Sequence, residues 1–369
     1  MINRLYTLFL SLFVSLVAYG QTAGTIASKD AMLYDSSRHL YEKGNKLTIV
    51  SKDLEWPKGL GGSVLTELQQ YLTAFFFGQA SDSYDAGWKQ FESLQGKEVH
   101  AIKDDTGTKR RYYDMVLRCL WLEQGRYVSF LARLEERNET SVITQKYSYF
   151  TFDLINKKVL TQKDVFNQTR MWQDANIRSQ FCELLDYMAN THTADSIDWD
   201  RLPNQFALEG QNIRFDLGVD KSGGVYSDVT DDMVDVLFSK DFKRWMKQKV
   251  STEGNTNLPM EAVYTTLPTD SVFPEVLPQF QGNVAAAIGQ SLSYTSITPE
   301  TTPVTKTFVS FIVDSDGSLK DITFLTVNNI ELNRAIAAAL QLLTGWKPAM
   351  HNGKPVACRY NLPLILHFQ

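Results

Sequence analysis

Cysteine, histidine and surplus positive charge are all scarce in this sequence. Three cysteines and five histidines in 369 residues are too few for a zinc cluster or a disulfide-rich scaffold. Lysine and arginine total 37 against 42 aspartates and glutamates, so the net charge is −5. A nucleic-acid-binding protein normally carries a basic surplus, which is missing here. The 43% of hydrophobic and 21% of charged residues are typical of a globular protein with two or three domains.

One long hydrophobic run opens the chain. It covers residues 5–18 after a single charge, Arg4, and is shorter than the roughly 20 residues of a membrane-spanning helix. Ala18 and Gly20 then supply small residues at positions −3 and −1 of a cleavage site. We expect residues 1–20 to be a signal peptide cleaved after Gly20, and the mature protein to be periplasmic or otherwise exported. An uncleaved membrane anchor is the alternative.

Export raises the question of disulfide bonds, because oxidising compartments permit them. Cys119, Cys182 and Cys358 are odd in number, so at least one has no partner within the chain. Three small buried thiols are the simplest expectation. A disulfide bond between Cys119 and Cys182 is the alternative that the sequence does not exclude.

The pattern along the chain predicts an α+β protein of two domains. Residues 21–46 are polar and are expected to be a tether, and residues 250–271 have the proline- and threonine-rich composition of a linker. Between them, about residues 45–249, we expect a mixed antiparallel sheet with packed helices. The predicted strands there are 47–56, 111–121, 126–135, 146–155 and short segments of 205–238, and the predicted helices are 64–77, 84–94, 174–190 and 239–248.

The last hundred residues predict a small strand-strand-helix-strand unit. Strands are expected at 304–313 and 319–327, joined by a hairpin at Asp316-Gly317, because glycine accepts a positive φ. Asn329 is placed to cap the following helix, and a final strand is expected from about 356 to 368.

Several segments of this unit are familiar. They are Phe280-Gln281-Gly282, Phe311-Ile312-Val313-Asp314, Trp346-Lys347-Pro348-Ala349, Asn352-Gly353-Lys354-Pro355-Val356 and Arg359-Tyr360-Asn361-Leu362-Pro363. Together they resemble the TonB C-terminal domain family, in the version common in Bacteroidetes-type bacteria, over about residues 272–369. The resemblance implies a periplasmic domain that binds extended peptides of outer-membrane receptors by strand addition. An energy transducer also needs a membrane anchor and a long spacer, which this chain lacks, so binding without energy coupling is the simpler hypothesis.

Site residues follow from this resemblance, residue by residue. The implied docking strand contributes the partner-binding residues Tyr360, Asn361, Leu362, Leu364, Leu366 and Phe368. The residues implied to shape the motif around it are Trp346, Pro348, Gly353, Pro355, Asp316 and Gly317.

The region 45–249 carries a weaker resemblance. Asp53-Leu54-Glu55-Trp56-Pro57 and the run from Tyr149 to Phe166 are similar to an extracytoplasmic domain of unknown function. That domain occurs in cell-wall-sensing anti-sigma factors and beside peptidoglycan deacetylases. The alternative function is therefore binding of peptidoglycan or another cell-wall glycan. Aromatic residues of the predicted strands would serve it, including Tyr112, Tyr113, Trp121 and Tyr127.

Catalytic and metal-binding motifs are missing from the sequence. It contains no nucleophile elbow and no H-E-x-x-H pattern, and Asp314 and Asp316 lack the later ligands of a calcium loop. His100, His192 and His351 could each meet a nucleophile in space, but a lone histidine is more often a polar surface residue. We expect no enzyme activity, no cofactor and no metal site.

Overall fold

The computed structural model describes residues 30–60, 65–101, 108–167, 206–210, 212–216, 226–229, 238–250, 263–265, 274–292, 304–327 and 329–367. The chain divides into two compact units. The N-terminal unit comprises residues 36–252, and the C-terminal unit comprises residues 253–369 together with residues 1–35. Both mix helices and strands, so the expected α+β class is confirmed.

The N-terminal unit is built on a mixed sheet. Its strand order is β1-β2-β4-β5-β6-β7, and the short strand β3 pairs with β1. Strands β2 and β4 run parallel, whereas β1 with β3, β4 with β5, β5 with β6 and β6 with β7 run antiparallel, so the sheet is mixed and largely antiparallel. The bounds are β1 Ala31–Lys43, β2 Lys46–Gly59, β3 Lys97–Glu98, β4 Lys109–Glu123, β5 Tyr127–Asn138, β6 Val142–Asp153 and β7 Lys158–Val159.

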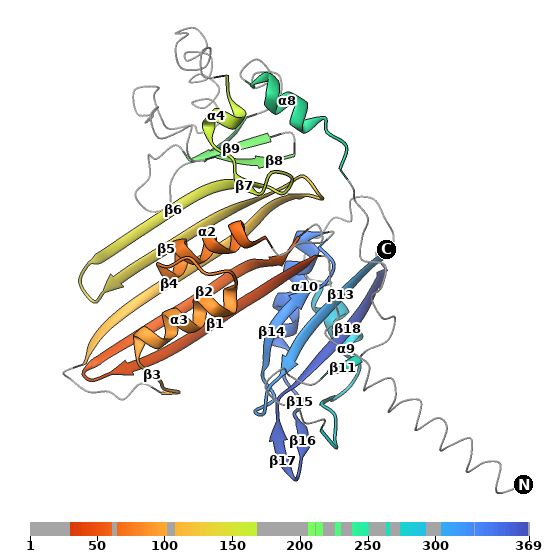
Figure 1. The fold of residues 1–369 in the computed structure, drawn as a ribbon. Coiled ribbons are helices and arrows are strands. Elements are labelled where there is room, and N and C mark those ends of the chain that lie inside the picture. Colours follow the sequence, from red (N-terminus) through yellow and green to blue (C-terminus); the bar gives the residue numbers. More distant parts are fainter. Residues whose placement is uncertain are drawn as a thin grey trace, which may run out of the picture. The chain divides into compact units, whose positions relative to one another are not determined.

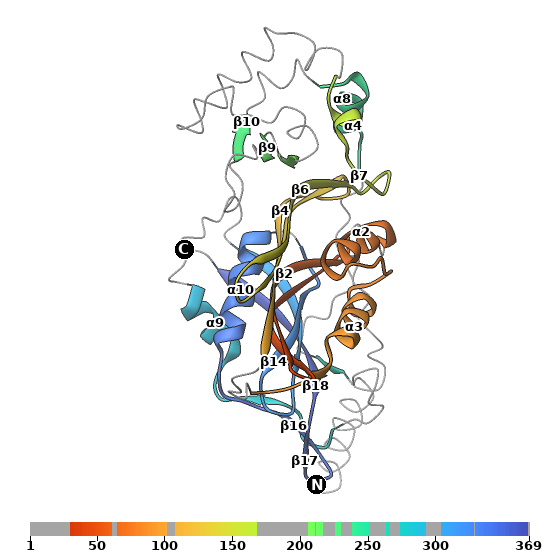
Figure 2. The same ribbon diagram turned by 90° about the vertical axis from the view of Figure 1, so that its left-hand side faces the viewer.

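Two helices, α2 (Thr66–Phe77) and α3 (Tyr84–Gln95), lie over one side of these strands, as Figures 1 and 2 show. Their aromatic side chains form the core with the sheet. Trp56 on β2 is fully buried and stacks on Phe77 of α2, with ring centroids 5.8 Å apart. On α3, Phe91 meets Tyr113 of β4 edge to face. Burial of such large rings gives each helix a fixed apolar face.

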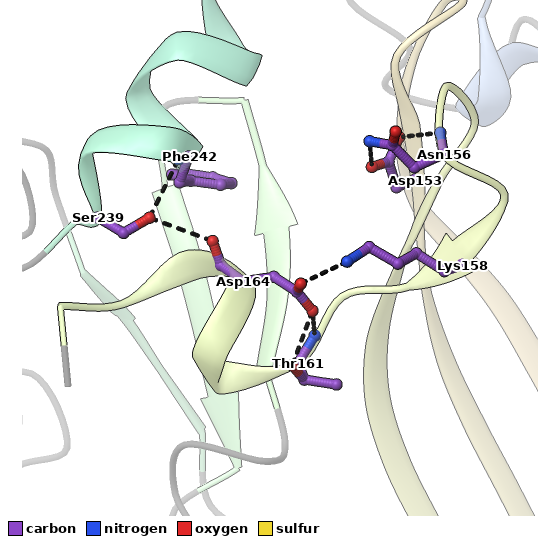
Figure 3. A network of polar contacts seen from close by, with 7 residues as sticks. All are labelled: Asp153, Asn156, Lys158, Thr161, Asp164, Ser239 and Phe242. Carbon is purple, nitrogen blue, oxygen red and sulfur yellow. Dashed lines mark hydrogen bonds and ion pairs between the residues drawn. The ribbon is translucent and has the colours of Figure 1, made fainter.

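A second, smaller sheet follows in the same unit. It has the order β10-β9-β8, with β8 Phe206–Glu209, β9 Asn212–Asp216 and β10 Tyr226–Val229. Two short helices, α4 (Gln162–Val165) and α8 (Lys240–Met246), accompany it. Figure 3 shows how they are joined: the Ser239 hydroxyl donates to the Asp164 carbonyl oxygen at 3.2 Å and accepts from the Phe242 N–H at 3.0 Å.

The C-terminal unit is an antiparallel sheet with two helices. Its strands have the order β11-β18-β13-β14, and the first residues of β1 pair with β14. The bounds are β11 Val263–Thr265, α9 Val284–Leu292, β13 Val304–Val313, β14 Leu319–Phe324, α10 Ile330–Leu342 and β18 Cys358–His367. Short pairs complete it: β12 Gln279–Phe280 with β15 Trp346–Lys347, and β16 Ala349–His351 with β17 Lys354–Val356.

Two expected connecting segments contain strands. Residues 21–46 were predicted to be a tether, yet β1 occupies 31–43 because Met32, Leu33 and Tyr41 supply buried apolar side chains. Residues 250–271 were predicted to be a linker, yet β11 lies within them and pairs with β18.

Some predictions fall outside the described residues, namely the signal peptide at 1–20 and the helix at 174–190. Among the described helices, none is long and apolar enough to cross a membrane.

Candidate functional site

Strand β18 is the element on which the predicted binding residues lie. Along its whole length it pairs with β13, from Val313 opposite Cys358 to Val304 opposite His367. On its other side the described residues of β11, 263–265, pair with Asn361, Tyr360 and Arg359. Within the described residues, no strand pairs with that side of residues 362–367. We call residues 362–367 the open segment of β18.

The side chains predicted to contact a partner point mainly into the core. Asn361 is 2% exposed, Leu362 8% and Leu364 1%. Tyr360 packs edge to face on Phe311, with ring centroids 5.3 Å apart. These residues fix the strand to the unit, and they cannot supply side-chain selectivity to a partner.

The remaining two predicted residues carry less information. Leu366 lies in β18 opposite Thr305, and its side chain is outside the described residues. Phe368 is outside them altogether.

Sequence reasoning missed Ile365, which is 49% exposed and belongs to the opposite face of the strand. Side chains alternate between the two faces of a strand, and beyond Asn361 the predicted residues are all at even positions, which excluded the outward-facing position 365. The signal that could have found it is the continuous apolar run Leu364-Ile365-Leu366, where one residue must face outward.

An ion pair holds the start of β18. The Arg359 guanidinium bonds to the Asp321 carboxylate of β14 and donates to the Ser310 hydroxyl of β13 at 3.0 Å. Both partners belong to the same sheet, so this cluster fixes the register of three strands. Its bonds are satisfied within the unit, and it is structural.

The Trp346 motif is also structural. Its ring is 6% exposed and lies among Phe280, Phe311 and Tyr360 at centroid distances of 5.2 to 5.5 Å. The turn between β13 and β14 approaches it closely, because a β-carbon on Gly317 would lie 2.5 Å from the Trp346 carbonyl oxygen. Asp316, in the same turn, accepts from the Ser318 hydroxyl at 2.6 Å and from the Ser318 N–H at 2.8 Å. These bonds hold the pKa of Asp316 below its usual value.

The rest of the motif forms a hairpin. Asn352 and Gly353 both have positive φ, +51° and +70°, as a two-residue turn between paired strands requires. Pro355 lies in β17 opposite Met350, and Pro348 stands between β15 and β16. The final strand, predicted from about residue 356, follows this hairpin and begins at Cys358.

The aromatic residues proposed for glycan binding do not share one exposed surface. Tyr113 is 8% exposed and Tyr127 is fully buried, and the Tyr127 hydroxyl accepts from the Gly210 N–H at 3.1 Å. Burial raises the pKa of Tyr127. Trp121 is 39% exposed, but a β-carbon on Gly210 would lie 2.8 Å from its ring. The Tyr112 ring lies 4.3 Å from the Arg137 guanidinium carbon.

The remaining candidates are the metal-ligating side chains and the cysteines. Among the described residues, no group of three or more histidine, cysteine, aspartate and glutamate side chains could hold a metal ion. Cys119 and Cys358 are both buried, and Cys182 and His192 lie outside the described residues.

No family model and no curated protein matches this chain. A solved DUF3298 family protein from Bacteroides fragilis is similar at 13% identity and a TM-score of 0.42, over 60% of this chain and all of its own. A DUF3298 family protein from Pseudomonas aeruginosa is similar at 10% identity and a TM-score of 0.34, over 57% of this chain and 95% of its own.

The resemblance to the TonB C-terminal domain was wrong. The similar structures are DUF3298 proteins, and no TonB family model matches. The resemblance depended on a short proline- and glycine-containing block before the final strand. Such a block is also typical of any tight hairpin that leads into a strand.

Proposed function

We propose that this protein is an exported envelope protein that binds extended peptide segments of other envelope proteins by strand addition on β18. The observation that carries the proposal is the unequal pairing of β18, which β13 covers over ten residues and β11 over three. An unpaired strand side offers a row of backbone donors and acceptors to another chain.

The dimensions and chemistry of the open segment suggest its occupant. Six residues at about 3.3 Å each give an edge of about 20 Å, which suits a peptide of about six residues. Ile365 presents an exposed apolar side chain at this edge, so a peptide with an apolar residue beside it is favoured. The buried Leu362 and Leu364 keep the strand rigid, which lowers the entropy lost on binding.

The peptide extends the edge alongside β11 and need not displace it. The described residues of β11 pair no further than Asn361, and the open segment begins at the next residue. The bound peptide and β11 would then lie end to end on the same side of β18.

The test is an array of ten-residue peptides that cover envelope proteins, probed with three forms of the full chain. Ile365→Lys places a charge on the edge, a substitution that natural edge strands use against pairing. Leu342→Lys is the matched control, because Leu342 is 77% exposed and belongs to helix α10 rather than to β18. We expect hits shared by the native chain and Leu342→Lys and weakened at least tenfold in Ile365→Lys.

Hydrogen exchange of the amides then locates the peptide. Protection confined to residues 362–367 supports strand addition. Hits that bind all three forms equally, hits that protect other amides, or an array without hits would each overturn the proposal.

A further inference from the structure

A serine, a histidine and a glutamate form a hydrogen-bonded chain on β1 and β3 of the N-terminal unit. The Ser37 Oγ lies 3.1 Å from the His39 Nε2, and the His39 Nδ1 lies 2.9 Å from the Glu98 Oε1. Each nitrogen of the ring therefore has one partner. Ser37 and His39 are two residues apart on one strand, which places them on the same face.

Strand β3 brings the glutamate to the ring. Tyr41 of β1 is directly opposite Glu98, so His39 is its diagonal neighbour, within reach of a long side chain. The Val99 N–H donates to the Leu40 carbonyl oxygen at 2.9 Å and continues this pairing. The position of Glu98 is thus set by backbone contacts rather than by a mobile loop.

Aromatic neighbours hold the imidazole ring in place. The Trp88 ring of α3 lies 5.1 Å from it and the Tyr41 ring 6.1 Å from it. The Tyr41 hydroxyl donates to the Glu92 carboxylate at 3.0 Å, which fixes that ring in turn. Packing of this kind limits rotation of the histidine and keeps both nitrogens directed at their partners.

The order of the contacts decides the tautomer. An ionised carboxylate only accepts hydrogen bonds, so Nδ1 carries the proton that Glu98 accepts. In the neutral ring, Nε2 then has a lone pair that faces the Ser37 hydroxyl. This is the arrangement of a nucleophile, a general base and an orienting acid.

We propose that Ser37 is an activated nucleophile for small esters, with His39 as its base and Glu98 as the positioning residue. The Ser37 Oγ attacks the ester carbonyl carbon as its proton passes to Nε2. The carbon–oxygen bond to the alcohol breaks, and the alcohol leaves with that proton. Water then attacks the acyl-serine by the same proton transfers, releases the carboxylic acid and restores the serine.

The three side chains are partly exposed to solvent. The side chain of His39 is 23% exposed and that of Glu98 is 46% exposed, and Ser37 is half-buried. Sequence reasoning named other histidines and missed His39, because Glu98 is 59 residues away in the chain and no local motif joins them. Ser37, His39 and Glu98 belong to the N-terminal unit, so this proposal is independent of the peptide-binding proposal.

A fluorophosphonate, which modifies activated serines, is the probe. The full chain is treated with it, and the adduct is located by mass spectrometry. Ser36→Ala is the matched control for Ser37→Ala, because Ser36 is the exposed neighbour on the same strand. We expect the adduct on Ser37, unchanged in Ser36→Ala and absent from Ser37→Ala.

The base and the positioning residue are tested by rates. His39→Asn is expected to slow labelling at least about 100-fold, the usual contribution of a general base. Glu98→Gln keeps the acceptor oxygen but removes the charge that stabilises the imidazolium, so an intermediate loss is expected. Circular dichroism confirms that each variant is folded.

A thiol at the same position gives a second readout. Ser37→Cys is treated with iodoacetamide with and without His39→Asn, and we expect the histidine to accelerate alkylation. Labelling of Ser37 no faster than of Ser36, or rates independent of His39 in both assays, would overturn the proposal. A Glu98→Gln rate equal to the native rate would contradict the role assigned to Glu98.

Discussion

A β-carbon added to Gly96 would lie 2.4 Å from the carbonyl oxygen of Glu42, and Gly96 itself has a φ of +122°. The chain here leaves α3 and enters β3, directly against the backbone of β1. Only glycine combines this backbone conformation with such a close approach. Gly96 therefore allows β3 to pair with β1 and bring Glu98 to His39.

Gly96→Ala is expected to lower the free energy of unfolding by about 2–4 kcal/mol, because backbone strain and a backbone clash add together. It should also displace Glu98 and slow fluorophosphonate labelling of Ser37. Urea unfolding followed by circular dichroism measures the first effect. Gly44→Ala is the control: φ is +63° there but no atom lies within 4 Å, so strain alone should cost about 1 kcal/mol. Equal losses in the two variants would show that the close approach is unimportant.

Gln69 is a buried polar residue whose substitution should be costly. It is 2% exposed, accepts from the Trp56 indole N–H at 2.7 Å and donates to the Pro57 carbonyl oxygen. Gln69→Met keeps the volume but leaves the indole donor and the carbonyl without these bonds. We expect a loss of about 2–4 kcal/mol in unfolding free energy, since each unsatisfied buried group costs about 1–3 kcal/mol.

The neighbouring glutamine provides the matched control for this prediction. Gln70 bonds to Asp82 at 2.8 Å at an exposed site, so Gln70→Met should change stability by less than about 0.5 kcal/mol. Tryptophan fluorescence during urea unfolding measures both variants. A Gln69→Met protein as stable as the Gln70→Met protein would contradict the buried hydrogen-bond argument.

Much of the local structure could be predicted from the sequence. Apolar residues at helical spacing predicted α2, and runs rich in tyrosine, phenylalanine, leucine and valine predicted β4 and β5. The prediction that Asn329 caps α10 is also confirmed, because its side chain accepts from the Leu332 N–H at 2.9 Å. Such features depend on neighbours within a few residues, which a sequence displays directly.

The rest could not be predicted, because it depends on distant pairings. The sequence of β1 is largely polar, because its outward residues are serines, a histidine and charged groups. It forms a strand because other strands pair with it on both sides. β11 has three residues inside a proline-rich segment and exists through its contact with β18. Likewise the proposed role of His39 depends on Glu98, which the register between β1 and β3 places beside it.

The thiol of Cys358 should be protected in the folded protein. It is 2% exposed, and burial raises its pKa to about 11. At pH 8 the reactive thiolate is therefore rare as well as inaccessible. In a chain with Cys119→Ser and Cys182→Ser, iodoacetamide is expected to label Cys358 only as fast as the protein unfolds, and fully in urea. Rapid labelling in the native state, measured by mass spectrometry, would contradict this burial.

Asp164 should make stability dependent on acid pH. Partial burial alone would raise the pKa of its carboxyl, but hydrogen bonds from Lys158 and Thr161 outweigh that effect and hold the pKa below its usual value. Figure 3 shows the carboxylate between these partners; it accepts from the Thr161 N–H at 2.8 Å and from the Thr161 hydroxyl at 2.7 Å. Because the pKa is lower in the folded state, the ionised carboxylate stabilises the protein fully above the unfolded pKa of about 4. This stabilisation is lost as the pH falls through the folded-state pKa.

Asp164→Asn is therefore expected to be less stable than the native chain at pH 7 and to lose less stability between about pH 4 and pH 2. Thermal unfolding across this range measures the difference between the two proteins. Asp241→Asn is the control, because Asp241 is 88% exposed at the start of the neighbouring helix α8. Its curve should parallel that of the native chain. If Asp164→Asn also follows the native curve down to pH 2, then the bonds to Lys158 and Thr161 do not stabilise the carboxylate.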